Sequence, residues 1–303
     1  MIPSASVALG NPDEKARRNR PGGKAGAARG RSLFQATGAV KKFSHTALIL
    51  AGHGSTQNTD SSRFTRETAK KLGKRKIFKE VRAGFWKERP SFQEVFQGLE
   101  AREAIVVPWF LTRGYFVEKV LAEQFKDAPI PTRIVDPIGA RPEIVGLMRA
   151  RAERLRCRIR MRIRIKEILD LLTGKDRVRL EETSLLLASH GTPLHKGSRV
   201  AADGLAEELK KDGYQVSRAM FLEEEPKIAD WRQVAAMEGP VMVLPHFLAG
   251  GLHGSEDVPR LLGIPSGKEG WYQVDGRWIG YGAPIGTPVE MTELILKMVA
   301  AEI

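Results

Sequence analysis

The sequence predicts an α/β protein built from two tandem copies of one domain, each a mainly parallel sheet flanked by helices. Short apolar segments alternate with helix-length segments, a pattern typical of βαβ units. Several motifs occur twice in the same order, about 137 residues apart. The length of 303 residues also suits two domains better than one.

The clearest repeated motif is an apolar run that ends in a small residue, a histidine and a glycine. It occupies residues 48–55 and again 185–192, so that His190 lies 137 residues after His53. This period far exceeds the 20–50 residues of solenoid repeats, so each copy is expected to be a domain. Three further pairs follow in order: 85–90 with 221–226, 106–111 with 243–248, and 137–139 with 284–286. The offset of the last pair is 147, which indicates about ten residues added late in the second copy.

These repeats divide the chain into four segments. We expect a basic, disordered tail at 1–43, a first domain at 44–149, an arginine-rich connector at 150–182 and a second domain at 183–303. The tail is rich in Gly, Ala, Arg and Lys and has no apolar periodicity, so it cannot bury enough surface to offset its ordering entropy. An organelle-targeting role for it is a less favoured alternative.

Each domain has a predicted order of strands and helices. The first has strands at 46–50, 77–81, 104–107 and, more weakly, 133–135, with helices at 61–72, 91–99, 118–125 and 142–149. Ser91 and Glu94 have capping-box spacing for the second of these helices. The second domain has strands at 184–188, 215–220, 241–244 and 271–274, with helices at 199–211, 228–237, 255–262 and 289–302.

The connector alternates basic and apolar residues strictly from Arg154 to Lys166. A period of two predicts a strand, whose arginine face would guard a sheet edge. A solvated basic helix leading into residues 167–172 is an equally good interpretation. A polyanion site on the connector is a third, less favoured one.

The net charge of +13 comes from two segments. Residues 1–42 carry nine Lys/Arg and two acids, and residues 149–182 carry twelve and six, which accounts for the whole excess. The two repeated domains are therefore neutral together, and a nucleic-acid-binding face on them is not expected.

The remaining composition predicts a soluble cytoplasmic protein. A single cysteine, Cys157, excludes an intrachain disulfide and suits a reducing compartment. No apolar run reaches the roughly 20 residues of a membrane span, and no signal-peptide core follows Met1.

Four of the six histidines lie in the second copy, and two of them, His190 and His253, are expected at the same sheet edge. Neutral imidazole is the commonest metal ligand and titrates near neutral pH. The acidic run 223–225 would add a carboxylate to that edge, able to accept a proton or help hold a metal. We expect His246 to face the core or support the site, and His195 to be exposed.

At these residues the sequence resembles the class II chelatases of the sirohydrochlorin cobaltochelatase and ferrochelatase type. The shared elements are Gly52-His53-Gly54-Ser55 and Ser189-His190-Gly191-Thr192, the acidic stretch 221–226 ending in Pro226, Pro245-His246-Phe247-Leu248, Gly251-Leu252-His253, and Asp257-Val258-Pro259. The resemblance covers roughly 44–149 and 183–303. The long form of the family is a tandem of two such domains, in agreement with the repeat.

The resemblance implies insertion of a divalent metal, Co²⁺ foremost, into sirohydrochlorin without ATP, in cobalamin or siroheme biosynthesis. It implies His190 and His253 as metal ligands and catalytic residues together with Glu223, although Glu224 is an open alternative. The macrocycle is expected in a cleft between the domains. Ser189, Thr192, Gly251 and Arg260 are weaker candidates for substrate binding, and Arg199 is another basic candidate.

The first copy has changed at the equivalent positions. Phe116 stands where the second copy has His253, and Lys87 stands where it has Glu223. A phenyl ring cannot bind a metal ion and an ammonium would repel one. The first copy is therefore expected to keep the fold and lose the chemistry, which leaves His53 as a lesser candidate.

Two alternatives stay open. The chain could be a non-catalytic carrier of metal or tetrapyrrole, or its metal could be Fe²⁺ or Ni²⁺, since imidazole and carboxylate suit all three ions. The expected partners are the tetrapyrrole and the divalent metal, with no organic cofactor, nucleic acid or membrane. No phosphate-binding Gly-rich loop is present, in keeping with a reaction that needs no ATP. The sequence allows a monomer or a homodimer.

Overall fold

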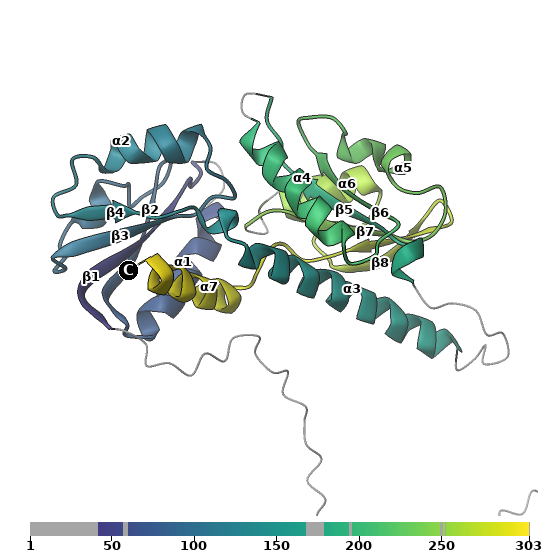
Figure 1. The fold of residues 1–303 in the computed structure, drawn as a ribbon, viewed down its shortest axis with the longest axis horizontal. Helices are drawn as coiled ribbons and strands as arrows, with labels where there is room; N and C mark the ends of the chain where they lie inside the picture. The colour runs from purple at the N-terminus through teal and green to yellow at the C-terminus, as the bar shows by residue number, and fades with distance from the viewer. Residues whose placement is uncertain are drawn as a thin grey trace, which may run out of the picture. The chain divides into compact units, whose positions relative to one another are not determined.

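The first half of the chain forms a four-stranded, all-parallel sheet with strand order β2-β1-β3-β4 (Figure 1). The computed structural model describes residues 42–56, 60–167, 179–193, 196–248, 251 and 253–302. Leu48, Ile49 and Leu50 are fully buried, as expected for a central strand covered on both faces. The elements of this half are β1 (Phe43–Gly52), α1 (Asp60–Lys74), β2 (Phe78–Phe85), β3 (Glu103–Pro108), α2 (Ala122–Phe125) and β4 (Thr132–Ile134).

The second half repeats this sheet and extends it, with strand order β6-β5-β7-β9-β8. Its central strand β5 pairs in parallel with β6 and β7, as β1 does with β2 and β3. The mixed α/β architecture with two mainly parallel sheets confirms the predicted fold class. The elements are β5 (Ser184–Ser189), α4 (Gly197–Lys210), β6 (Val216–Phe221), α5 (Trp231–Val234), β7 (Val241–Pro245), α6 (Val258–Leu262), β8 (Gly270–Val274) and β9 (Arg277–Tyr281).

The extra residues of the second copy form a β-hairpin. Strand β8 matches the prediction at 271–274, but it runs antiparallel to β9 at the sheet edge. The counterpart of β4 is β9, which the sequence reading missed: Val106 pairs with Ile134, and Val243 pairs with Tyr281. Asp275 and Gly276 both have positive φ, 50° and 76°, as a tight hairpin turn requires.

Two predicted helices are shorter than expected. Ser91 and Glu94 do exchange capping bonds, with the Glu94 amide donating to Ser91 Oγ at 3.1 Å and the Ser91 amide donating to Glu94 Oε2 at 2.9 Å. The helix nevertheless covers a single 3₁₀ turn, Glu94–Phe96, because Gly98 adopts a left-handed conformation. The prediction of a helix at 91–99 is therefore wrong. The helix predicted at 228–237 is reduced to a 3₁₀ turn, Ile228–Asp230, followed by α5.

The connector begins as a helix. Helix α3 runs without a break from Glu143 to Glu167, so the strand alternative for 154–166 is wrong and the helical alternative is confirmed. Local alternation misleads here because the described apolar positions do not all face the core: Leu155 is buried whereas Cys157 is exposed. Residues 168–178, the tail before residue 42 and His195 lie outside the described residues.

The helix that closes each half packs on the other half. Helix α3 contacts β7, β8 and α4, whereas α7 (Pro288–Glu302) contacts α1. Trp271 Nε1 donates to the Leu155 carbonyl at 2.8 Å, and Arg149 Nε donates to both carboxylate oxygens of Asp212. One hydrophobic cluster therefore includes Leu50 of the first sheet, Leu187 of the second, and both closing helices.

Arg151 joins the two closing helices. Its side chain is 3% exposed, and its guanidinium donates to the Pro284 carbonyl at 3.1 Å and to Glu290 Oε2 at 2.6 Å. Burial alone would raise the pKa of Glu290, but the Arg151 charge and hydrogen bonds from Thr287 hold it below its usual value. Among the residues that the structure describes, no helix is both long and apolar enough to cross a bilayer.

Candidate active site

His190 is the first residue after β5, at the carboxyl edge of the second sheet. Open parallel sheets bind ligands at this edge. The ring Nδ1 lies 2.7 Å from the Gly191 carbonyl, which assigns the Nδ1 proton to that bond and leaves the Nε2 lone pair available. Gly191 has a φ of +71°, and a Cβ there would lie 2.9 Å from the Phe221 side chain, so the turn requires glycine.

His253 lies beside His190, with ring centroids 4.8 Å apart in an edge-to-face arrangement. It opens a π-helical turn, His253–Asp257, that leads into α6. Its Nδ1 is 2.8 Å from Asp257 Oδ2, so this nitrogen is the donor and Nε2 is again the free one. Sequence reasoning gave Asp257 no role, although its spacing of four residues from His253 is the signal that could have found it.

Glu223 completes the group. Its Oε1 lies 3.7 Å from His190 Nε2, and its side chain is 53% exposed. Its backbone amide donates to the His190 carbonyl at 3.1 Å, which places the acidic stretch directly beside the histidine. The structure thus brings together the three residues for which sequence predicted catalysis: His190, His253 and Glu223.

Glu224 has a different environment from its neighbour. Its side chain is 13% exposed, and its carboxylate accepts bonds from the Thr192 amide and from Arg199 Nε at 3.0 Å. The Arg199 guanidinium also donates to the Glu225 carbonyl. These contacts favour a structural role for Arg199 and Glu224 over the substrate-binding and catalytic roles that the sequence left open for them.

The first half contains the same support. Glu88 accepts bonds from Ser62 and from Arg66 at 2.8 Å, and the Arg66 guanidinium also reaches the Arg89 carbonyl. Burial opposes ionisation of Glu88, but the bonds from Ser62 and Arg66 lower its pKa. Glu88 therefore corresponds to Glu224, and Lys87 corresponds to Glu223. The Lys87 amide donates to the His53 carbonyl at 2.8 Å, as the Glu223 amide does to His190.

Of the other predicted contact residues, Ser189 and Gly251 are engaged within the protein, whereas Arg260 lies exposed at the rim. Ser189 is buried, and its hydroxyl lies 2.9 Å from Nδ1 of His246. The Gly251 carbonyl accepts the amides of Gly254 and Ser255, both at 3.0 Å, and so caps the turn that carries His253. Arg260 is 74% exposed and bonds Asp257 Oδ1 at 2.7 Å, which keeps its guanidinium at the rim of the site.

His246 is a buried support of the site. It directly follows β7, is 3% exposed, and burial lowers its pKa to about 4. It is therefore a neutral imidazole at physiological pH, hydrogen-bonded through Nδ1 to the Ser189 hydroxyl. The equivalent residue of the first half is Trp109, which is also buried.

The first-half counterpart of the site is aromatic. His53 follows β1, and its ring lies 5.2 Å from Trp86 and 5.6 Å from Phe116. Phe116 opens a π-helical turn, Phe116–Leu121, just as His253 opens one in the second half. This shared backbone feature supports the equivalence of Phe116 and His253 that the sequence predicted.

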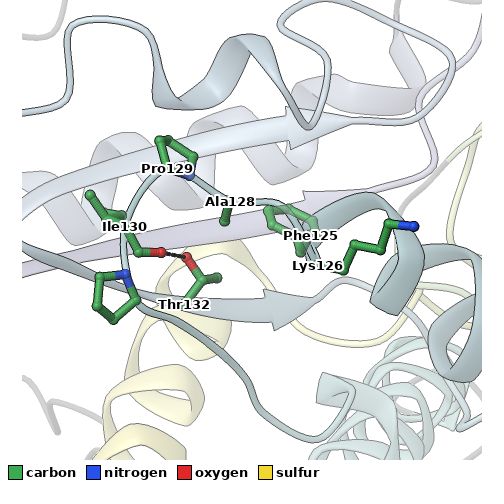
Figure 2. Close-up of a pocket in the computed structure, with 7 residues that line it drawn as sticks. Phe125, Lys126, Ala128, Pro129, Ile130 and Thr132 are labelled. Carbon is green, nitrogen blue, oxygen red and sulfur yellow. Dashed lines mark hydrogen bonds between the residues drawn. The ribbon is translucent and has the colours of Figure 1, made fainter.

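The second-half group consists of side chains of types that can bind a metal ion. It offers two imidazole nitrogens and one carboxylate at a surface-accessible sheet edge, and free positions remain on any ion held there. Within the described ranges, no group of three or more His, Cys, Asp or Glu side chains is placed so that it could hold a metal ion. A hollow of about 350 Å³ in the first half involves none of these residues (Figure 2). It is lined by Phe125, Lys126 and 128–132.

Two curated relatives match this chain over different lengths. A probable sirohydrochlorin cobaltochelatase of Halobacterium salinarum is 28% identical over 266 residues, which cover 84% of this chain and 90% of the relative. A sirohydrochlorin cobaltochelatase of Methanosarcina barkeri is 28% identical over 129 residues, which cover 39% of this chain and 95% of that protein. A relative of full length and one of half length thus both match, as expected for a tandem repeat.

Solved structures show the same fold. CbiX, described as the terminal enzyme of siroheme biosynthesis in denitrifying bacteria, superposes with a TM-score of 0.58 at 20% identity over 85% of this chain and 99% of that one. SirB from Bacillus subtilis, solved with Fe³⁺, superposes with a TM-score of 0.57 at 16% identity over 84% and 94%. The CbiX family model matches twice, at residues 47–155 and 184–302. This chain therefore belongs to the CbiX family, with one family unit in each half.

Proposed function

We propose that the chain inserts a divalent metal ion, Co²⁺ foremost, into sirohydrochlorin without ATP. The observation that supports this most strongly is the group formed by His190, His253 and Glu223 at one sheet edge, with ring centroids 4.8 Å apart and a carboxylate 3.7 Å from His190 Nε2. Two relatives named as sirohydrochlorin cobaltochelatases, one matching most of this chain and one matching a single half, support sirohydrochlorin as the substrate and Co²⁺ as the metal.

Metal insertion needs a cation with part of its hydration removed and a base for two pyrrole protons. The Nε2 atoms of His190 and His253 are the free nitrogens of their rings, so they hold the ion in the proposed mechanism. Asp257 orients the His253 ring by accepting the Nδ1–H hydrogen bond, which leaves Nε2 facing away from that carboxylate.

Proton removal falls to the carboxylate and to the imidazoles once the ion has left them. Glu223 is exposed enough to reach the macrocycle. It also lies near enough to His190 to exchange a proton with it, directly or through one water molecule. Arg260, at the rim, supplies a cation for the anionic side chains of the macrocycle. The metal and the tetrapyrrole are both substrates in this scheme.

The test is an anaerobic absorbance assay of the full chain with sirohydrochlorin and Co²⁺, Ni²⁺ or Fe²⁺ in parallel. We expect the spectrum of the metallated macrocycle to appear faster than in protein-free controls, and fastest with Co²⁺. A higher rate with Ni²⁺ or Fe²⁺ would keep the reaction and change the metal. The cleft between the halves, the cytoplasmic location and the monomeric or dimeric state stay predictions.

A carrier without catalysis is the second candidate function, because the first half has lost the ligands of the second. It predicts saturable binding of the macrocycle with a metallation rate equal to the spontaneous one. That result would overturn the chelatase proposal and leave the carrier in its place.

A further inference from the structure

The first half presents an aromatic cluster at the place where the second half has its candidate active site. The cluster consists of His53, Trp86, Phe110 and Phe116, and Trp86 is 37% exposed. Phe116 lies 5.0 Å from Trp86 and 4.7 Å from Phe110, measured between ring centroids. Lys87 Nζ lies 3.8 Å above the Trp86 ring, so a cation borders the exposed aromatic face.

His53 keeps the ring contact that orients His190. Its Nδ1 lies 2.9 Å from the Gly54 carbonyl, which repeats the contact of His190 with Gly191 and leaves Nε2 available. The turn is kept as well, since Gly54 has a φ of +69° and a Cβ there would lie 2.8 Å from the Glu88 side chain. The sheet edge has therefore retained an imidazole although the other two groups of the site are gone.

These surroundings do not suit a free aqueous ion. Phe116 replaces the second imidazole, Lys87 replaces the carboxylate, and Glu88 is already bonded by Ser62 and Arg66. One imidazole does suffice as an axial ligand for a metal that four pyrrole nitrogens already hold. Aromatic rings beside that imidazole then contact the flat face of the macrocycle.

We infer that the first-half aromatic cluster is a binding site for a metallated tetrapyrrole, with His53 Nε2 as the axial ligand of the metal. Trp86 and Phe116 contact the ring face, and Lys87 pairs with an anionic substituent of the macrocycle. This inference rests on the proposed function for its ligand class, because the metallated macrocycle is the product of that reaction. It assigns the first half a role in holding product.

The test uses the full chain with His190→Ala and His253→Ala, so that ligation by the second half is removed. Chemically prepared Co(II)-sirohydrochlorin is titrated into this protein under anaerobic conditions and followed by absorbance and electron paramagnetic resonance. We expect the splitting from one axial nitrogen. Adding His53→Ala is expected to abolish that splitting and to weaken binding at least tenfold, and His53→Gln serves as a second variant should the alanine protein fail to fold.

Trp86 provides a graded control. Trp86→Ala is expected to weaken binding several-fold with the nitrogen splitting retained, whereas Trp86→Phe keeps most of the affinity. Equal affinity and unchanged splitting after loss of His53 would overturn the inference. Turnover of the unsubstituted chain is measured separately, so a failed chelatase assay with intact His53-dependent binding would overturn the proposed function and leave this site standing.

Discussion

The two halves of this chain share a scaffold at the sheet edge and differ in the groups that the scaffold displays. Both retain a histidine after the central strand, a glycine with positive φ next to it, and an Arg–Glu pair beneath the following loop. They differ at two positions, Lys87 against Glu223 and Phe116 against His253, of which only Phe116 is half-buried rather than exposed. The half-buried Arg–Glu pair therefore belongs to the shared fold, and the proposed chemistry depends on the two exchanged positions.

The largest expected effect concerns the contact between the two closing helices, α3 and α7, through which the halves pack on each other. Arg151→Ala is predicted to lower the free energy of unfolding by about 3–5 kcal/mol, because it leaves Glu290 without its buried partner. Urea unfolding followed by circular dichroism measures this. Arg154 reaches the same carboxylate at 3.5 Å from a 52% exposed side chain, so Arg154→Ala should cost less than about 1 kcal/mol. Equal losses in both variants would contradict the account of the closing helices.

The buried His246 is expected to make the stability of the second half depend on pH. Its counterpart in the first half, Trp109, does not titrate and gives no such dependence. Burial lowers the His246 pKa to about 4, against 6.5 in the unfolded chain. The unfolded state therefore binds a proton first, and stability that is complete above pH 6.5 is lost as the pH falls towards 4. The loss amounts to about 3 kcal/mol. It is measured as the difference in urea unfolding between wild type and His246→Phe at pH 7.5 and 4.5, and parallel pH profiles of the two proteins would refute it.

Glu223→Gln tests the exposed carboxylate of the second half. Loss of a general base is expected to lower kcat about 100-fold, equivalent to about 2.7 kcal/mol. The adjacent, exposed Glu225 provides the matched control, and Glu225→Gln should keep the wild-type rate. If the two variants have the same kcat under saturating metal and sirohydrochlorin, Glu223 is not the base.

The smallest of these effects is expected from Asp257, which acts through His253. Asp257→Asn keeps a hydrogen bond to Nδ1 but removes the negative charge, so the apparent affinity for Co²⁺ should fall about tenfold. The neighbouring exposed residue Glu256 is a control for charge alone, and Glu256→Gln should leave the KM for Co²⁺ unchanged. A Co²⁺ KM that is unaltered in Asp257→Asn would remove this residue from the site.

Much of the fold could be predicted because the sequence contains the same domain twice. Paired strands at a constant offset predict the sheet edge and therefore place His190 and His253 at the same edge. The position of β9 could not be obtained in this way, because the β8 hairpin shifts the offset from 137 to 147. The packing of α3 on the second half and of α7 on the first could not be predicted either. An amphipathic pattern shows that a helix packs on something, but it does not show on which sheet.

The distinction between Glu223 and Glu224 shows where sequence reasoning stops. Both are acidic residues between the same strand and the same proline, and nothing in their spacing separates them. The structure separates them by burial and by partners, since Arg199 holds one and the other lies exposed near His190. The predicted helix at 91–99 was wrong because local spacing did not show where the helix ends. Its capping residues are present, but the helix stops after one turn, before the left-handed Gly98.

The central claim is that metal insertion takes place in the second half. The most direct test is the single-turnover rate of Co²⁺ insertion into sirohydrochlorin by His190→Ala and by His253→Ala, beside His45→Ala as a control at an exposed histidine of β1. We expect the first two variants to fall to the protein-free rate and His45→Ala to match wild type. Retention of at least half of the wild-type rate in both His190→Ala and His253→Ala would place the reaction elsewhere in the molecule and contradict the claim.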